Sequence, residues 1–472
     1  MALHDLTLTE VLVGLNTRAF SAEELTHALI AQADRFVDLN AFISFDEGQI
    51  LANARSTDER RSAGDTALLL GAPIILKDNI DVAGSVTTGG TNALRHNVAL
   101  RSAPVAQRLQ DAGAVFFGKA NLHELAFGCT SNNGSFGAAR NPYDPDRIAG
   151  GSSGGTAAGV GARMAPAGIG SDTGGSVRIP AGFCGVAGFR PTTGRYPQDG
   201  IVPISHSRDT AGPLARRVGD LHLLDGILAG RAPSGGPLPL LSETRIGVPR
   251  GYFFEALDPD VESGAEALLQ RLASYGVTLV EADVPDIERV HKAGNFPVLL
   301  YEAVVDLNAY LATGDTGLDF ASVVAEVGSP DVREILEPLL GTGAIKESAY
   351  RDAMTIHRPH LQRIYAAYFK EHRLDAMIYP TVPVLPILID QEQSGALQGG
   401  DTVPAITLFD RNTGPASNAG IPSLSMPSGL STYGLPLGFT IDAPMGHDDA
   451  LLALGMALEA LEPEMPAPQL DW

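Results

Sequence analysis

The order of apolar and polar positions predicts strands that alternate with helices in the first part of the chain. Ser21 and Glu24 have the spacing of a capping box and open a helix of apolar periodicity that runs towards Val37. The segment "GAPIILKDNID" is a continuous apolar run between glycine and polar residues, which predicts a buried strand that ends near Lys77. A helix from "SAPVAQRLQDAGA" and a second buried strand from "AVFFGK" follow it. This alternation is typical of an α/β layered core.

The second half of the chain shows the same kinds of element around a long helical stretch. Residues 258–375 have a mostly helical pattern, and the segments "ETRIGVPR" and "LDAMIYPTVPVLP" predict strands on either side of them. The Pro-, Gly- and Ser-rich residues 230–244 are the best candidate for a connector. We therefore predict one large α/β unit with a helical insertion. Its predicted parts are an N-terminal helical segment packed on the core (1–65) and a main domain (66–472), made of the core (66–230 and 375–472) and the insertion (about 245–375).

Composition narrows the classes of partner. The chain has 472 residues, of which 44% are hydrophobic and 19% charged, so it can bury a sizeable core. Its net charge of −22 argues against nucleic acid and anionic membranes as partners, because both attract cations. The start "MALHDLTLTEVLVGL" is acidic where a secretory signal is basic, and no run reaches the roughly 18 apolar residues of a membrane span. The two cysteines form no disulfide framework. We expect a cytoplasmic protein that acts on a small molecule.

Three short near-motifs lack a residue that their chemistry requires. "GAVFFGKA" has Ala120 where a phosphate-binding loop needs Ser or Thr. "HELAF" has Phe127 in place of the second histidine of a zinc-protease helix, and one His with one Glu does not make a metal site. "GIGSDT" lacks the third glycine of a dinucleotide fingerprint. We therefore expect neither a metal nor a cofactor.

The segment "GGSSGGT" admits two interpretations. Gly151, Ser153 and Gly155 satisfy G-x-S-x-G, the nucleophile elbow of α/β-hydrolases, which needs an acid and a histidine later in the chain. Histidines are present there, so counting does not exclude an elbow. However, a second serine framed by glycines follows at Ser176 in "SDTGGSVRIP", and such glycines free backbone N–H groups to converge on an oxyanion. Together with Lys77 at a strand end, this pattern favours a Ser–Lys hydrolase that works without histidine.

The chemistry of such a site is coherent. A serine hydroxyl becomes nucleophilic when a base removes its proton, and a lysine can be that base if burial lowers its pKa from about 10.4 towards neutrality. A second serine between the nucleophile and the lysine can relay protons in both directions, because a hydroxyl both donates and accepts. The same relay can protonate the leaving nitrogen of an amide.

The runs "GGSSGGTAAG" and "GSDTGGSVRIPAGFCGVAGFRPTTGR", with "KDN" at the strand end, closely resemble the amidase signature family of serine hydrolases. The resemblance implies that Lys77 is the catalytic lysine, that Ser152 is a bridging serine preceded by a cis peptide bond, and that Ser176 is the nucleophile. It also implies a large mixed central sheet covered by helices on both faces. Its further implications are an oxyanion hole from the backbone amides of Thr173, Gly174, Gly175 and Ser176, supporting positions at Ser153 and Asp172, and a structural or site-shaping role for Arg178.

A finer resemblance concerns the substrate. Stretches such as "NLHELAFGCTSN" and "RNTGPASNAGIPSLS" look most similar to bacterial indoleacetamide and mandelamide hydrolases. This implies a small aryl or arylalkyl amide that is converted to a carboxylic acid and ammonia or an amine. In the family the loop with Gly128, Cys129 and Thr130 lies beside the substrate carbonyl, and we expect Phe127 and Ile345 to line the pocket. Core packing is an equally simple explanation of the apolar side chains.

Two other functions within the family stay open. A carbamate or anilide hydrolase would use the same three catalytic residues. The A subunit of a tRNA-dependent amidotransferase would need partner chains, and "DRNT" at Asp410–Thr413 is similar to an Asp-x-x-Thr near the glutamine site of that subunit. Homodimers are common in the family.

Overall fold

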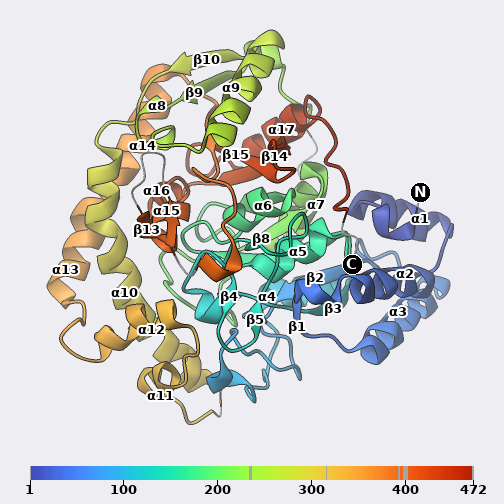
Figure 1. The fold of residues 1–472 in the computed structure, drawn as a ribbon. Coiled ribbons are helices and arrows are strands. Elements are labelled where there is room, and N and C mark those ends of the chain that lie inside the picture. Colours follow the sequence, from blue (N-terminus) through green and yellow to red (C-terminus); the bar gives the residue numbers. More distant parts are fainter. Residues whose placement is uncertain (1, 233–235, 315, 392–393, 397–401, 470–472) are drawn as a thin grey trace.

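The computed structural model describes residues 2–232, 236–314, 316–391, 394–396 and 402–469. Its centre is an 11-stranded mixed sheet (Figure 1). In spatial order the strands are β1 (Phe42–Ser44), β3 (Val115–Ala120), β2 (Pro73–Lys77), β6 (Ala167–Asp172), β8 (Thr210–Ala215), β7 (Ala187–Arg190), β14 (Ser423–Leu430), β15 (Pro436–Asp442), β11 (Ala376–Pro380), β9 (Arg245–Val248) and β10 (Thr278–Glu281). Two small strand pairs lie outside it: β4 (Asn132–Asn133) with β5 (Gly137–Ala138), and β12 (Ser394–Ala396) with β13 (Thr402–Pro404).

The pairing of the strands brings the carboxyl ends of three strands, β2, β3 and β6, together at one end of the sheet. β2 lies parallel to both of its neighbours, β3 and β6, so the carboxyl ends of these strands meet. β6 then pairs antiparallel with β8, which places Asp172 opposite Thr210 at the same end. All five residues of β2 are buried, as the continuous apolar run predicts for a strand covered on both faces. Lys77 therefore ends its strand inside the protein.

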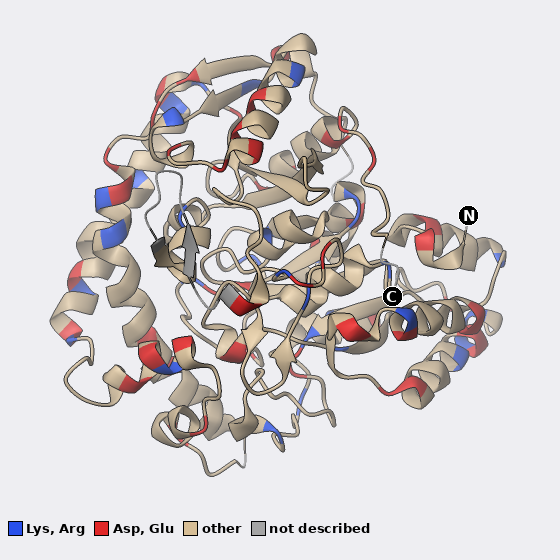
Figure 2. Cartoon of the chain, viewed as in Figure 1, with Lys and Arg blue, Asp and Glu red and all other residues tan. Residues whose placement is uncertain are grey.

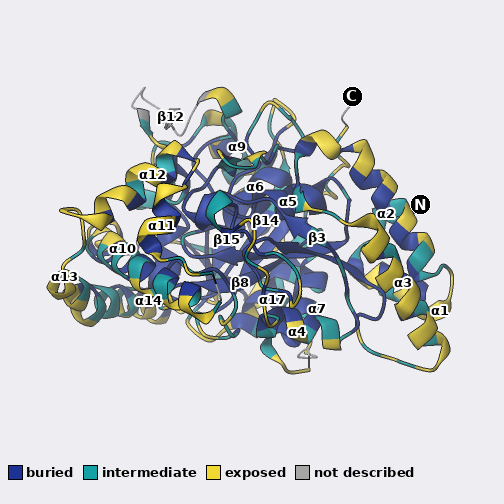
Figure 3. Ribbon diagram, turned by 90° about the horizontal axis from the view of Figure 1, so that it is seen from below, coloured by how far each residue is buried: buried dark blue, intermediate teal, exposed yellow. Residues whose placement is uncertain are grey.

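Helices cover both faces of the sheet, which confirms the predicted fold class. α5 and α6 pack on one face, and α7 and α17 pack on the other (Figure 3). The helices are α1 (Leu8–Thr17), α2 (Ala22–Arg35), α3 (Glu47–Ser62), α4 (Pro104–Asp111), α5 (Gly154–Gly161), α6 (Arg178–Cys184), α7 (Val218–Ala229), α8 (Arg250–Phe253), α9 (Pro259–Ser274), α10 (Ile287–Thr313), α11 (Phe320–Ala325), α12 (Pro330–Leu336), α13 (Glu347–Asp352), the π-helix η7 (Ala353–His357), α14 (Arg358–His372), α15 (Ala405–Phe409), α16 (Gly414–Ala419) and α17 (Asp448–Glu459). Shorter 3-10 segments are η1 (Leu3–Asp5), η2 (Val37–Leu39), η3 (Asn92–Leu94), η4 (Glu124–Ala126), η5 (Leu241–Glu243), η6 (Glu337–Leu340) and η8 (Ile389–Gln391).

The predicted elements of the first part are confirmed with small shifts of their ends. Ser21 and Glu24 form the capping box of α2 through reciprocal hydrogen bonds. The helix that was expected to run towards Val37 ends at Arg35. One element inside the helical stretch was missed: β10 pairs parallel with β9 and extends the sheet. Its four residues are partly exposed at the sheet edge, so their pattern does not distinguish a short strand from a helix end.

The N-terminal helices α1 to α3 and the helices α10 and α13 lie on opposite sides of the molecule (Figure 1). At the N-terminal end, the backbone N–H groups of Leu8 and Thr9 donate to the carboxylate of Asp220 on α7. Charged residues are mostly found on the outer helices, whereas the central strands contain few (Figure 2). Among the described residues, no helix is both long enough and apolar enough to cross a membrane.

The "HELAF" segment contacts α12 and the residues just before it. The ring of His123 contacts the Asp331 carboxylate of α12 at 2.9 Å between Nε2 and Oδ2. The carboxylate of Glu124 accepts hydrogen bonds from the N–H groups of Gly328 and Ser329, which precede α12. Both side chains are buried, so this His and this Glu hold two parts of the fold together.

Candidate active site

The fully buried side chain of Lys77 ends between two serines. Its Nζ lies 2.7 Å from Ser152 Oγ and 2.8 Å from Ser171 Oγ. Burial lowers the pKa of Lys77 from 10.5 to about 7, because desolvation outweighs the opposing effect of the Asp172 and Asp209 carboxylates. A lysine with this pKa is largely a neutral amine slightly above pH 7, and a neutral amine can accept a proton from a hydroxyl.

Ser152 and Ser153 point to different partners although they are adjacent. The Gly151–Ser152 peptide bond is cis, as the family resemblance implies. The Ser152 carbonyl accepts a hydrogen bond from the backbone N–H of His123, and the Ser152 hydroxyl contacts Lys77 Nζ. Ser153 is also fully buried, but its hydroxyl donates to the backbone carbonyl of Ser171 at 3.1 Å. A nucleophile elbow needs an exposed hydroxyl, so this geometry argues against the interpretation centred on Ser153.

Glycines beside Ser153 allow the backbone to pack closely. A Cβ on Gly155 would lie 2.4 Å from the carbonyl oxygen of Ala41, and one on Gly154 would lie 2.4 Å from Ser131 Oγ. Any other residue would therefore push the serine loop away from these neighbours. The backbone N–H of Ser153 donates to the carbonyl of Ser176 at 3.1 Å, so the two serine segments are directly joined.

Ser176 follows a tight loop after β6. Gly175 has a φ of +150°, and a Cβ there would lie 2.1 Å from Thr413 Oγ1. The same Thr413 hydroxyl donates to the carbonyl of Gly174 at 2.8 Å. This contact fixes the loop from the C-terminal part of the chain, and Ser176 is 7% exposed at the end of it.

A buried ion-pair network lies beneath the loop. Asp172 Oδ1 lies 3.0 Å from Arg178 Nη2 and 2.9 Å from Arg190 Nη1, with all three side chains fully buried. Burial alone would raise the pKa of Asp172, but the two guanidinium groups hold it well below its ordinary value. Arg178 also donates to the Thr413 carbonyl. Asp172 and Arg178 therefore tie the loop to the same C-terminal segment.

The expected substrate loop runs close to these groups, but its members differ in their surroundings. Cys129 belongs to an apolar cluster that includes Ile179 and Phe183 of α6 and Phe409 of α15. Gly128 packs against the ring of His123, and Thr130 Oγ1 lies 3.2 Å from His123 Nδ1. Phe127 packs instead with the helices of the insertion. Ile345 is partly buried in the link between η6 and α13.

Three polar residues at the site were not assigned to it from the sequence, although Asn79 stands in the "KDN" segment and Asp410 begins the "DRNT" segment. Ser171 contacts Lys77, and its Oγ accepts a hydrogen bond from Asn79 Nδ2 at 2.9 Å. Asp410 lies beside the loop, since a Cβ on Gly174 would be 3.0 Å from its Oδ2. Burial raises the pKa of Asp410 to about 6, against the effects of Arg208 and Arg178. The sequence carries no signal for Ser171, because its contact with Lys77 depends on the pairing of two strands that are distant in the chain.

Comparisons with known proteins identify the family of this chain. A family model described as "Amidase" matches residues 24–452. An indoleacetamide hydrolase of Agrobacterium vitis is 42% identical over 453 residues, which cover 96% of this chain and 96% of the relative. A mandelamide hydrolase of Pseudomonas putida is 40% identical over 488 residues, which cover 99% of this chain and 93% of the relative.

Solved structures described as amidases have the same fold as this chain. A crystal structure described as an amidase superposes with a TM-score of 0.87 at 33% identity, covering 97% of this chain and all of the other. The native peptide amidase of Stenotrophomonas maltophilia superposes with a TM-score of 0.85 at 28% identity, covering 99% of both chains.

Proposed function

This chain belongs to the amidase family and is an amidase, and from that premise we propose that it hydrolyses a small aryl or arylalkyl amide to a carboxylic acid and ammonia or an amine. Ser176 is the nucleophile in this proposal, Ser152 the proton relay and Lys77 the base. The observation that carries it is the 2.7 Å contact between Lys77 Nζ and Ser152 Oγ, made by a fully buried lysine whose pKa burial lowers to about 7.

The proposed reaction has two halves that use the same relay. Ser176 Oγ attacks the amide carbonyl while its proton passes through Ser152 to neutral Lys77. The backbone N–H groups of residues 173–176 stabilise the oxyanion, and the nitrogen leaves after the proton returns through Ser152. Water then hydrolyses the acyl-enzyme by the reverse relay. Ser171 keeps Lys77 Nζ in place, because its hydroxyl contacts that nitrogen at 2.8 Å.

The acyl part of the substrate has an apolar neighbourhood in this proposal. The cluster around Cys129, Ile179 and Phe409 borders the loop, since Ile179 Cδ1 would lie 2.8 Å from a Cβ on Gly175. An aromatic ring buried there would gain the usual hydrophobic stabilisation. The relatives named for indoleacetamide and mandelamide support an arylalkyl acyl group.

A panel of substrates tests the proposal. Release of ammonia or amine would be measured from phenylacetamide, indoleacetamide, mandelamide, an anilide, an aryl carbamate and glutamine. We expect the highest kcat/KM on one of the three arylalkyl primary amides, and no turnover by Ser176→Ala. Turnover of the carbamate or the anilide alone would favour the alternative hydrolases. Turnover of glutamine alone would favour the amidotransferase subunit.

A further inference from the structure

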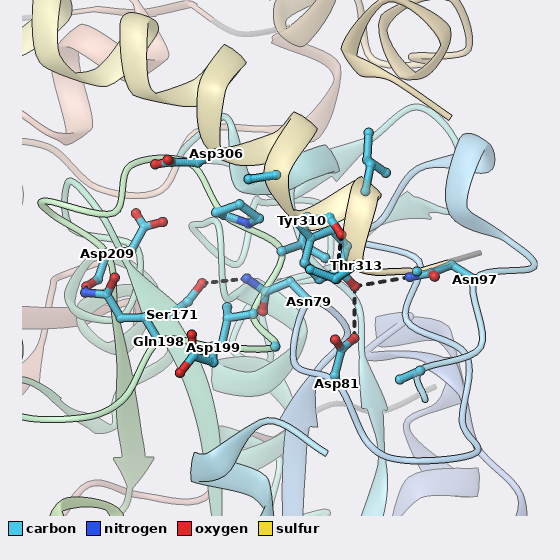
Figure 4. A pocket seen from close by; sticks show the side chains of 18 of the residues that line it. Asn79, Asp81, Asn97, Ser171, Gln198, Asp199, Asp209, Asp306, Tyr310 and Thr313 are labelled. Atoms are coloured by element: carbon cyan, nitrogen blue, oxygen red, sulfur yellow. Dashed lines mark hydrogen bonds between the residues drawn. The ribbon is translucent and has the colours of Figure 1, made fainter. Parts of the chain in front are cut away.

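A cavity of about 740 Å³ opens beside the lysine and is lined by none of the expected substrate-loop residues. Asn79 and Ser171 line it near the lysine (Figure 4), and Thr173 is also part of its lining. Tyr310 and Asp306 of α10 line it from the insertion. We refer to this space as the acidic cavity.

Carboxylates dominate the charge of the acidic cavity. Its charged lining consists of Asp81, Asp199, Asp209 and Asp306, with Arg101 and His206. His206 is already engaged, because its Nδ1 lies 3.0 Å from the carboxylate of Asp306. Burial raises the pKa of Asp81 and of Asp209, because desolvation outweighs the hydrogen bonds that both carboxylates accept and, at Asp81, the charge of Lys119. The wall therefore favours a positively charged occupant.

An unpartnered acceptor in the lining near the lysine points to an occupant that donates hydrogen bonds. Asn79 is 1% exposed, and its Nδ2 donates to Ser171 Oγ. Its Oδ1 has no hydrogen-bond partner in the described part of the chain. A buried amide oxygen without a donor costs free energy, so a bound N–H group would stabilise it. The amide nitrogen of the same side chain and Lys77 Nζ both donate to Ser171 Oγ, so Asn79 is linked to the lysine through one residue.

The two sides of the site differ in polarity and charge, and so do the two products of amide hydrolysis. When the Ser176 O–C bond forms and the C–N bond breaks, the nitrogen takes the relayed proton and leaves as ammonia. Ammonia then takes a proton from water and becomes ammonium at neutral pH, while the acyl group stays on Ser176. The acyl side is apolar, and the acidic cavity combines four carboxylates with a free amide oxygen.

We propose that the acidic cavity is a binding site for a small ammonium cation, through which the released nitrogen leaves the reaction centre. The inference rests on the proposed function, because that reaction supplies the cation. Asn79 Oδ1 accepts a hydrogen bond from the cation, and the aspartates neutralise its charge.

Thallium(I), a monovalent cation of about the size of ammonium, locates the site directly. Crystals of the wild-type chain would be soaked in thallium(I) acetate, with sodium acetate as the control. The expected result is an anomalous peak inside the acidic cavity and in contact with Asn79 Oδ1. Soaked crystals with no peak in the cavity would overturn the inference.

Product inhibition provides a second test. Initial rates on the best amide of the panel would be measured at pH 7 with ammonium chloride against sodium chloride at equal ionic strength. Asp199 is exposed at the cavity wall, so Asp199→Asn should raise the inhibition constant of ammonium about three- to fivefold. Glu59→Gln removes the same charge from α3, outside the cavity, and should leave that constant unchanged. Equal constants in all three proteins would contradict the inference.

The outcomes separate this inference from the proposed function. Hydrolysis that depends on Ser176, without a thallium peak, would remove only the cation site. A thallium peak in a protein that turns over no amide of the panel would remove only the proposed function.

Discussion

Replacing Lys77 with alanine should remove the inflection near pH 7 from the pH profile of kcat/KM. The reason is the burial that lowers the pKa of Lys77 from 10.5 to about 7. At pH 8 a lysine with that pKa is about 90% neutral, whereas an unperturbed one is about 0.3% neutral, a difference of roughly 300-fold in available base. This preference for the neutral amine amounts to roughly 5 kcal/mol.

The sign of the pH effect follows from the role of the neutral form. Below pH 7 the wild-type rate should rise about tenfold for each pH unit, because the neutral fraction rises by that factor, and above pH 7 it should level off. Lys77→Ala should be slower by about 10²- to 10⁴-fold at pH 8 and should lack this rise. The assay is kcat/KM on the best amide of the panel between pH 5 and 9.5.

Other buried carboxylates titrate in the same range, and two of them serve as controls. Burial raises the pKa of Asp410 to about 6 and that of Glu459 to about 7. Asp410→Asn and Glu459→Gln should keep the inflection near pH 7 if the lysine causes it. An inflection that persists near pH 7 in Lys77→Ala would refute the reasoning.

Three further substitutions test the residues that hold the candidate active site in place. Asp172→Asn leaves two buried arginines without their counter-charge, so the free energy of unfolding should fall by about 3–5 kcal/mol in denaturant titrations, and wild-type stability would contradict the ion-pair account. Gly175→Ala places a Cβ 2.1 Å from Thr413 Oγ1 and should lower kcat/KM at least about 10²-fold, whereas Gly341→Ala, with open space around it, should have no effect. Ser153→Ala loses two buried hydrogen bonds, one to the carbonyl and one from the N–H of Ser171, each worth about 1 kcal/mol, and should keep measurable turnover; a complete loss would restore the elbow interpretation.

Features of the fold that depend on a few neighbouring residues could be predicted from the sequence. The apolar run before Lys77, the capping box at Ser21 and the glycines around the two serines each act within a few residues, and the structure has the corresponding strand, helix and tight loops. The family resemblance adds the cis bond before Ser152, which no apolar pattern indicates.

Contacts between segments that are far apart in the chain could not be predicted from the sequence. Asp331 meets His123, and Thr413 meets Gly174, across more than two hundred residues, and no periodicity carries that information. The pairing of Ser171 with Lys77 depends on the register of two parallel strands, which a single sequence does not supply.

The identity of the nucleophile is the claim on which the rest depends. Wild-type protein would be treated with a fluorophosphonate, digested, and the modified serine mapped by mass spectrometry, with Ser176→Ala as the control. The account predicts a single modified serine at Ser176 and no labelling of the variant. Modification at Ser153, or equal labelling of the variant, would contradict it.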